Sequence, residues 1–234
     1  MKLKVMFALT ILLASFALAG GTKAVERGTY ILNLGGRDVG HNTYTLEKGK
    51  KGYKSRAQTV LNLPQGRVVL TTDLELSEEL TPIYYQLKAT LPGQVQSIET
   101  TIKGDKAESV IDVGGTIRKT TTKLTLPCYI LDNNMIDHWC YLVKKLDLNS
   151  AKEQTINLFV PQAALTTNLT LKKKKEEEIK IGGKSYKAVV MEGILASKIE
   201  LTLYIEPKEM KLLKVVIPEQ NFSAELSSKV KPIK

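Results

Sequence analysis

Apolar and polar residues alternate along most of this chain, and the alternation constrains the fold more than any other feature. In residues 199–205, isoleucine or leucine occupies every second position, so these side chains share one face of an extended strand. The same alternation recurs in residues 30–34, 67–76, 81–91, 156–160 and 222–226. Each run predicts a β-strand with one face for a core and the other for water.

Short turns separate these runs. Glycine pairs stand at 35–36, 114–115 and 182–183, and further turn residues stand at 49–52, 63–66, 91–93, 103–106, 206–209 and 218–221. Because connections this short cannot cross over to a parallel neighbour, the sequence predicts a mostly antiparallel meander of about a dozen strands or more. A sheet of so many twisted strands curls, so we expect an all-β barrel, half-barrel or β-roll.

Residues 126–148 depart from this pattern and predict one amphipathic helix. Apolar residues recur at three- and four-residue spacing: Met135, Ile136, Trp139, Leu142, Val143 and Leu146. The opposite side carries Asp137, His138, Tyr141, Lys144 and Lys145. Asp132 or Asn133 is the expected N-cap. Such a helix packs against the sheet or caps it, either as a plug in the core or as a gate to a ligand cavity.

The sequence has only two cysteines: Cys128 precedes this helix and Cys140 lies within it. In an oxidising compartment we expect a disulfide between them, worth roughly 3 kcal/mol for so short a loop, with two buried thiols as the alternative. No metal site is expected. His138 and Cys140 lie two residues apart on a helix and point to different faces, and no CxxC or HExxH motif completes a ligand set.

Residues 1–19 have the pattern of a signal peptide. Lys2 and Lys4 precede an apolar run, and Ala17-Leu18-Ala19 supplies the small residues of a cleavage site. We therefore expect a periplasmic or secreted protein with a single β-rich domain, residues 20–234, and no membrane span in the mature chain. Loss of the two lysines lowers the formal net charge from +10 to +8. A basic surface favours anionic partners, but the charges are interspersed and nucleic acid is not an expected partner.

Catalytic motifs give little support for an enzyme. The segment GGKS, residues 182–185, resembles the end of a phosphate-binding loop, but Glu178 stands where the first glycine belongs. There is no GxSxG or GxGxxG motif, and His41 and His138 are the only histidines. A hydrolase with two carboxylates from separate strands is a third hypothesis, although no pair stands out. We expect no enzyme activity, no catalytic residue and no cofactor.

The run KKKKEEE, residues 172–178, places charges on the apolar side of a strand. A strand cannot bury those charges without a large free-energy cost. The sequence therefore predicts that this strand pair projects beyond the sheet or turns here, as a solvated hairpin tip.

Three segments in order carry a family resemblance: GTYILNLGGRDVGHNTYTLEK at 28–48, LDNNMIDHWCYLVKKLDL at 131–148 and ELTLYIEPKEMKLLKVVIP at 200–218. Together they resemble uncharacterised exported bacterial all-β proteins of the domain-of-unknown-function kind, which have a spiral β-roll or half-barrel sheet and one helix. The resemblance implies a bacterial envelope setting and that fold, and it transfers no catalytic residue. More distantly, the chain is similar to half-barrel lipoprotein carriers and isoprenoid-binding exported barrels, a likeness of fold alone.

Two functions from different classes follow as hypotheses. The first is a non-enzymatic envelope protein that binds or carries an apolar or amphiphilic, lipid-like molecule inside the curled sheet. Its expected ligand-binding residues are Met135, Trp139, Leu142, Tyr85, Leu87, Leu201 and Leu203. The second is an assembly or scaffold protein that binds an envelope protein or a glycan through a sheet edge or a basic face.

Overall fold

Fifteen strands form one continuous sheet in the computed structural model, which describes residues 23–229. The predicted signal peptide, residues 1–19, lies outside the described residues. The first eight strands are β1 (Lys23–Leu34), β2 (Arg37–Gly49), β3 (Gly52–Leu63), β4 (Gly66–Leu76), β5 (Pro82–Leu91), β6 (Gln94–Lys103), β7 (Lys106–Val113) and β8 (Thr116–Lys123). The remaining strands are β9 (Cys128–Ile130), β10 (Gln154–Val160), β11 (Leu165–Ile181), β12 (Lys184–Leu195), β13 (Ile199–Glu206), β14 (Lys211–Ile217) and β15 (Phe222–Leu226).

Between β9 and β10 the chain forms the α-helix α1 (Ile136–Leu142) and the 3₁₀ turn η1 (Val143–Lys145). Two further 3₁₀ turns, η2 (Pro161–Ala163) and η3 (Pro218–Gln220), connect strands. Within residues 23–229, α1 is the one α-helix, and no helix is long and apolar enough to cross a membrane.

The sheet is a meander whose two halves meet at the first and last strands. Its strand order runs from β8 back to β1, then through β15 and β14 down to β9. Strand β1 pairs with β15 in antiparallel register, with Tyr30 opposite Leu226, and every other pairing is antiparallel except that of β9 with β10. Strands β8 and β9 are the two ends, so the sheet is not closed. The prediction of an all-β half-barrel or roll with one helix is confirmed.

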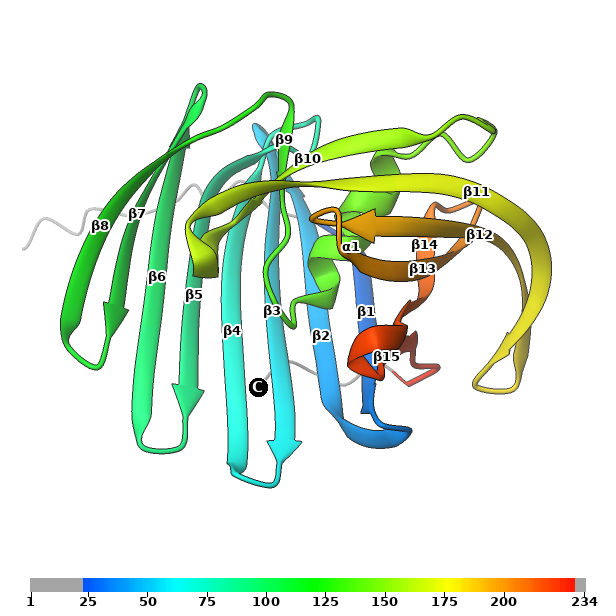
Figure 1. Cartoon of the computed structure of the whole chain (residues 1–234), viewed down its shortest axis with the longest axis horizontal. Helices are drawn as coiled ribbons and strands as arrows, with labels where there is room; N and C mark the ends of the chain where they lie inside the picture. Colours follow the sequence, from blue (N-terminus) through cyan, green and yellow to red (C-terminus); the bar gives the residue numbers. More distant parts are fainter. Residues whose placement is uncertain (1–22, 230–234) are drawn as a thin grey trace, which may run out of the picture.

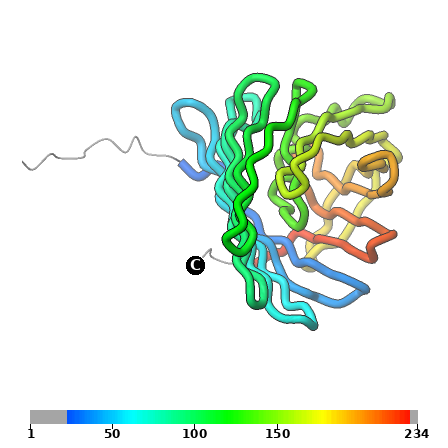
Figure 2. Tube along the Cα trace, turned by 60° about the vertical axis from the view of Figure 1, so that its left-hand side comes forward, coloured from blue at the N-terminus to red at the C-terminus, as the bar shows by residue number. Residues whose placement is uncertain are grey.

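The sheet curls so that its second half faces its first. Figure 1 shows β1 to β8 as a broad curved wall, with β10 to β12 running crosswise in front of it. Figure 2 shows the same arrangement from the side, as one layer coloured blue to green and a second coloured yellow to red. The main core fills the space between the layers and takes side chains from both, among them Leu74, Tyr85, Leu158 and Leu203.

Helix α1 lies inside this curl and is buried on every side. The prediction of a helix here is confirmed. The helix has no polar face in contact with water, however, because Asp137, His138 and Tyr141, which were expected to form that face, are all buried. The N-cap prediction is wrong, because Met135 holds that position and provides no side-chain cap. The carboxylate of Asp132 is hydrogen-bonded to other partners, described below.

The charged run 172–178 lies within the long strand β11, so the prediction of a hairpin tip in these residues is wrong. The turn comes later, at Gly182 and Gly183, which both have positive φ. The strand pair does project: β10 pairs with β11 only over 165–171, and β13 pairs with β12 only from Val189 onward. A register shift between Lys173 and Lys175 breaks the alternation here. The charges therefore stay at the surface.

The predicted disulfide is not present, because Cys128 and Cys140 are both free and buried in different places. Cys128 belongs to a small second cluster with Ala107, Leu124 and Phe159. Cys140 lies in the main core, where its Sγ is 3.4 Å from the carbonyl oxygen of Ile136 in the preceding helical turn. Burial raises the pKa of Cys128 to about 11 and that of Cys140 to about 12. Both thiols therefore stay protonated at neutral pH, the unreactive form.

This arrangement predicts the outcome of a thiol titration. The native protein should react very slowly with a thiol reagent, because both sulfur atoms are buried. After unfolding in denaturant without reductant, both cysteines should react. Recovery of no free thiol under those conditions would show that the cysteines are bridged.

Gly40 provides a second prediction, about strand packing. Its φ is +152°, and a Cβ built there would lie 1.9 Å from the carbonyl oxygen of Val60 on the neighbouring strand. Gly35 also has a positive φ, +59°, but a Cβ there would meet nothing within 4 Å. Gly35→Ala should therefore lower the free energy of unfolding by about 1 kcal/mol and Gly40→Ala by about 3 kcal/mol or more, as measured by urea denaturation. Equal losses of unfolding free energy in the two variants would contradict the close packing of Gly40 against Val60.

Candidate functional site

A cavity of about 430 Å³ opens on the inner face of the first half of the sheet. We call it the strand cavity. Most of its lining is apolar and comes from five neighbouring strands, β3 to β7, and the turn after β5: Leu61, Leu63, Val68, Leu70, Leu87, Ala89, Leu91, Pro92, Ile98, Ile111 and Val113. Its polar lining residues are Gln65, Gln96, Arg118, Asn134 and Gln162. Such a cavity has the size and composition of a small-molecule site.

Strand register explains why these residues meet. Leu87 pairs with Ile98, Ile98 with Ile111, and Ile111 with Arg118, so the four side chains form one row across β5 to β8. In the next row, Leu70 pairs with Ala89 and Ala89 with Gln96. Because paired residues point to the same side of a sheet, each row presents its side chains to the cavity.

A second cavity, of about 680 Å³, lies beside the helix. We call it the helix cavity. Its apolar lining comes from α1, the residue that follows β9 and the strands and turns that follow the helix, all within residues 131–222: Leu131, Ile136, Trp139, Val160, Ala163, Leu165, Leu195, Ala196, Ile199, Ile217 and Phe222. Trp139 is the single tryptophan of the sequence, so its fluorescence should report on what enters this cavity.

Asn134 and Gln162 line both cavities, so the segment before α1 and the turn η2 form a partition between them. Hydrogen bonds hold the two segments together. The Gln162 backbone N–H donates to Asp132 Oδ1 at 3.2 Å, and the Gln162 side-chain amide donates to the Asn133 carbonyl oxygen at 3.3 Å. Thr59 on β3 donates from its hydroxyl to the Asn134 carbonyl oxygen at 2.8 Å. The partition is therefore tied to η2 and to the sheet.

Asp132 is the centre of this partition. Its Oδ2 accepts a hydrogen bond from the Tyr85 hydroxyl at 2.8 Å, and its Oδ1 accepts from the backbone N–H groups of Asn133 and Gln162. Burial raises the pKa of Asp132 to about 6, and these hydrogen bonds limit the rise. The backbone N–H of Asp132 in turn donates to Nδ1 of His138 at 3.0 Å, which leaves the ring proton on Nε2 in the neutral tautomer.

Asp137 and His138 form a buried polar pair within α1. His138 Nε2 lies 3.9 Å from Asp137 Oδ2, and neither side chain has any exposed surface. Neither carboxylate oxygen of Asp137 makes a hydrogen bond of ordinary geometry, although Asn42 and Ser55 lie beside it. Burial raises the pKa of Asp137 to about 7 and lowers that of His138 to about 3. The histidine is therefore neutral throughout the physiological range.

Two carboxyl groups with raised pKa values are also a feature of hydrolase sites. Here Asp132 lines the helix cavity, whereas Asp137 lines none of the cavities described. Asp137 is sealed from solvent, and Asp132 already accepts three hydrogen bonds through its two oxygens. A substrate could reach Asp137 only if α1 moved out of the sheet.

The residues expected to bind a ligand are distributed between cavities and core. Leu87 lines the strand cavity and Trp139 the helix cavity. Met135 lies beneath the partition, where its Sδ is 3.6 Å from the Thr59 hydroxyl, and Tyr85 holds Asp132. The other three are core residues of α1 and β13: Leu142, Leu201 and Leu203. Leu201 also borders a separate groove over β11 to β13.

The sequence patterns did not predict several of the residues that line the cavities. Arg118 lies in the stretch TIRKTTTK, residues 116–123, which has no apolar alternation to reveal an inward face. Gln162 lies in a turn. Their positions depend on which strands pair and in what register, and no local pattern encodes that.

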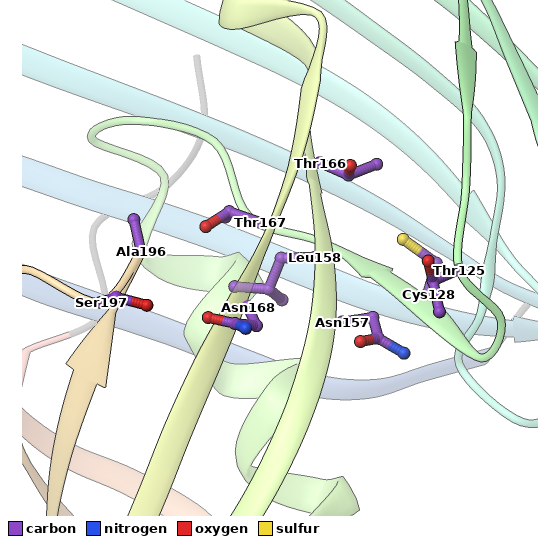
Figure 3. A pocket seen from close by; sticks show the side chains of 9 residues that line it. All are labelled: Thr125, Cys128, Asn157, Leu158, Thr166, Thr167, Asn168, Ala196 and Ser197. Atoms are coloured by element: carbon purple, nitrogen blue, oxygen red, sulfur yellow. The ribbon is translucent and has the colours of Figure 1, made fainter.

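Figure 3 shows another cavity, of about 310 Å³, over β9 to β11 and the turn after β12. Its lining is largely polar, with Asn157 and Asn168 side by side as paired residues of neighbouring strands. Asn157 also donates to the Pro127 carbonyl oxygen at 3.3 Å. No charged side chain lines this cavity among the described residues, so it offers less for a ligand than the two apolar cavities do. Residues 23–229 also contain no cluster of three His, Cys, Asp or Glu side chains suited to a metal ion.

Comparisons of the chain with protein families, with curated proteins and with solved structures found no match. The family resemblance stated from the sequence therefore stays a prediction.

The buried Asp137 predicts how stability depends on pH. Its pKa is about 7 in the folded protein and about 4 in an unfolded chain, so between those values the folded state binds more protons. The free energy of unfolding therefore falls as pH rises from 4 to 7, and Asp132 adds a contribution of the same sign up to about pH 6. His138 acts in the opposite direction from about pH 3 to 6.5.

Asp137→Asn isolates the contribution of Asp137. Relative to this variant, the wild-type protein should lose a few kcal/mol of unfolding free energy between pH 4 and pH 7, measured by urea denaturation at several pH values. The exposed Glu108→Gln should follow the wild-type curve. Parallel curves for the wild-type protein and Asp137→Asn would show that the Asp137 carboxyl does not titrate with a raised pKa.

Proposed function

We propose that the protein is a non-enzymatic carrier or sensor of an apolar or amphiphilic, lipid-like small molecule, which it binds in the strand cavity. One observation carries the proposal. Apolar side chains from five neighbouring strands, β3 to β7, line an open space of about 430 Å³ instead of packing against one another. Leaving apolar surface uncovered forgoes about 25 cal/mol per Å², and a ligand with a hydrocarbon part would recover that free energy.

The construction of the walls supports the same function. Leu87, Ala89 and Ile98 are buried residues on strands that pair along their length. Sites built on paired strands keep their shape, so the protein loses little conformational entropy when it binds. Polar groups share the lining, and Gln65, Gln96 and Arg118 are available to the polar end of an amphiphile.

The predicted export of the chain is consistent with this proposal. Apolar molecules that cross the aqueous space of a cell envelope need a carrier that covers them, and a curled sheet with an inner apolar face provides such a cover. The envelope setting rests on the signal-peptide pattern of residues 1–19 and is part of the proposal.

Filling the cavity tests the function. Ala89 is 4 % exposed and lies between Leu70 and Gln96 on the cavity wall. Ala89→Phe should place a ring in the cavity and weaken binding of the neutral fluorophore N-phenylnaphthylamine by about tenfold or more. Thr90→Phe adds the same ring to the outer face of the same strand and should leave binding unchanged.

Native mass spectrometry of mature protein purified without detergent gives an independent readout. The wild-type protein should carry a small apolar ligand and Ala89→Phe should carry less of it. Wild-type protein that is free of ligand and does not bind the fluorophore would overturn the proposal.

A further inference from the structure

Arg118 is the one charged side chain among the described residues that line the strand cavity. It lies on β8, at one end of the sheet, and continues the apolar row of Leu87, Ile98 and Ile111. An apolar row that ends in a guanidinium matches a molecule with a hydrocarbon tail and an anionic head.

Among the described residues, no carboxylate lines the strand cavity beside Arg118. The polar groups that share the lining are the neutral amides Gln65, Gln96, Asn134 and Gln162. Within the described part of the chain, Arg118 has no ion pair within 4 Å. The acidic residues of β6 and β7 are Glu99, Glu108 and Asp112. Glu99 and Glu108 lie on the other face of the sheet, where they border a groove with Lys119, and Asp112 alternates with the inward-facing Ile111 and accepts a hydrogen bond from the Gly115 backbone N–H.

The partition limits the ligand to one chain in the strand cavity. The turn η2 and the segment before α1 are joined by the hydrogen bonds of Gln162 with Asp132 and Asn133, and these separate the strand cavity from the helix cavity. A second hydrocarbon chain would have to break those bonds to reach further apolar surface.

We propose that the ligand is a single-chain anionic amphiphile, with a carboxylate or phosphate head bound by Arg118 and its tail lying along the row of Ile111, Ile98 and Leu87. The proposal rests on the function proposed above and specifies the class of ligand. A guanidinium recognises both kinds of head because its planar N–H groups pair with two oxygens at once. Gln96, in the next row of the same cavity, is an amide that can donate a further hydrogen bond to the ligand.

Binding of amphiphiles with one tail and different heads tests the proposal. The wild-type protein should bind palmitate and hexadecyl phosphate at least tenfold more tightly than hexadecanol, and should bind hexadecyltrimethylammonium most weakly. In Arg118→Gln, binding of palmitate and hexadecyl phosphate should weaken by about tenfold while binding of hexadecanol stays the same. Titration calorimetry measures each affinity, and the ratio of the palmitate to the hexadecyl phosphate affinity shows which head is preferred.

Lys119→Gln is the matched control. It removes the same charge from the adjacent residue of β8, on the opposite face of the sheet, and should leave all four affinities unchanged. If Lys119→Gln weakened palmitate binding as much as Arg118→Gln, the effect would be one of net charge and the head site would be wrong. Inorganic phosphate that binds as tightly as hexadecyl phosphate would also overturn the proposal, because the tail would then contribute nothing.

The same measurements separate the two proposals. If hexadecanol and N-phenylnaphthylamine bind but the wild-type protein does not prefer anionic heads, the carrier function stands and the anionic class is wrong. If no amphiphile and no fluorophore binds, the carrier function itself is wrong. Both variants change exposed residues of a terminal strand, and urea denaturation should show unfolding midpoints like that of the wild-type protein.

Discussion

The burial of α1 on every side is the constraint on which the rest of the structure depends. A helix of seven residues is too short to be stable alone in water, and this one carries Asp137 and His138 into the core. Buried polar groups without good partners destabilise a fold by about 1–3 kcal/mol each, so the apolar packing around α1 has to exceed that cost. The curled sheet provides this packing. The helix cavity lies next to α1, and the partition that leads into α1 also borders the strand cavity through Asn134.

Much of the fold could be predicted from local pattern. In β13, the alternation of residues 199–205 correctly separated the buried Leu201 and Leu203 from their partly exposed neighbours, because a strand between core and water repeats every two residues. The same rule failed for α1. It assigned Asp137 and His138 to a polar face, as though one side of the helix met water, whereas the first half of the sheet covers that side: Asn42 and Ser55 lie beside Asp137, and the Tyr85 ring packs against His138.

The candidate site could be predicted only in part. Leu87 and Trp139 were expected to contact a ligand and do line cavities, since apolar residues on an inward face are candidates wherever the core leaves space. Arg118 could not be found in this way. Its place beside Ile111 follows from the register of β7 with β8, and its place in the row with Leu87 requires two further registers. Local sequence predicts each turn, but it does not predict how the registers of several strand pairs combine to align residues on distant strands.

The pairing of β1 with β15 has a consequence for how the molecule assembles. It is an early strand joined to a late one, with α1 in the middle of the intervening chain, so many contacts link distant segments and folding should be slow. Until β15 arrives, β1 presents an unpaired edge that can template aggregation. The pairing of β15, a strand of only five residues, thus decides whether a newly made chain forms a single sheet or remains as two half-sheets with exposed, aggregation-prone edges.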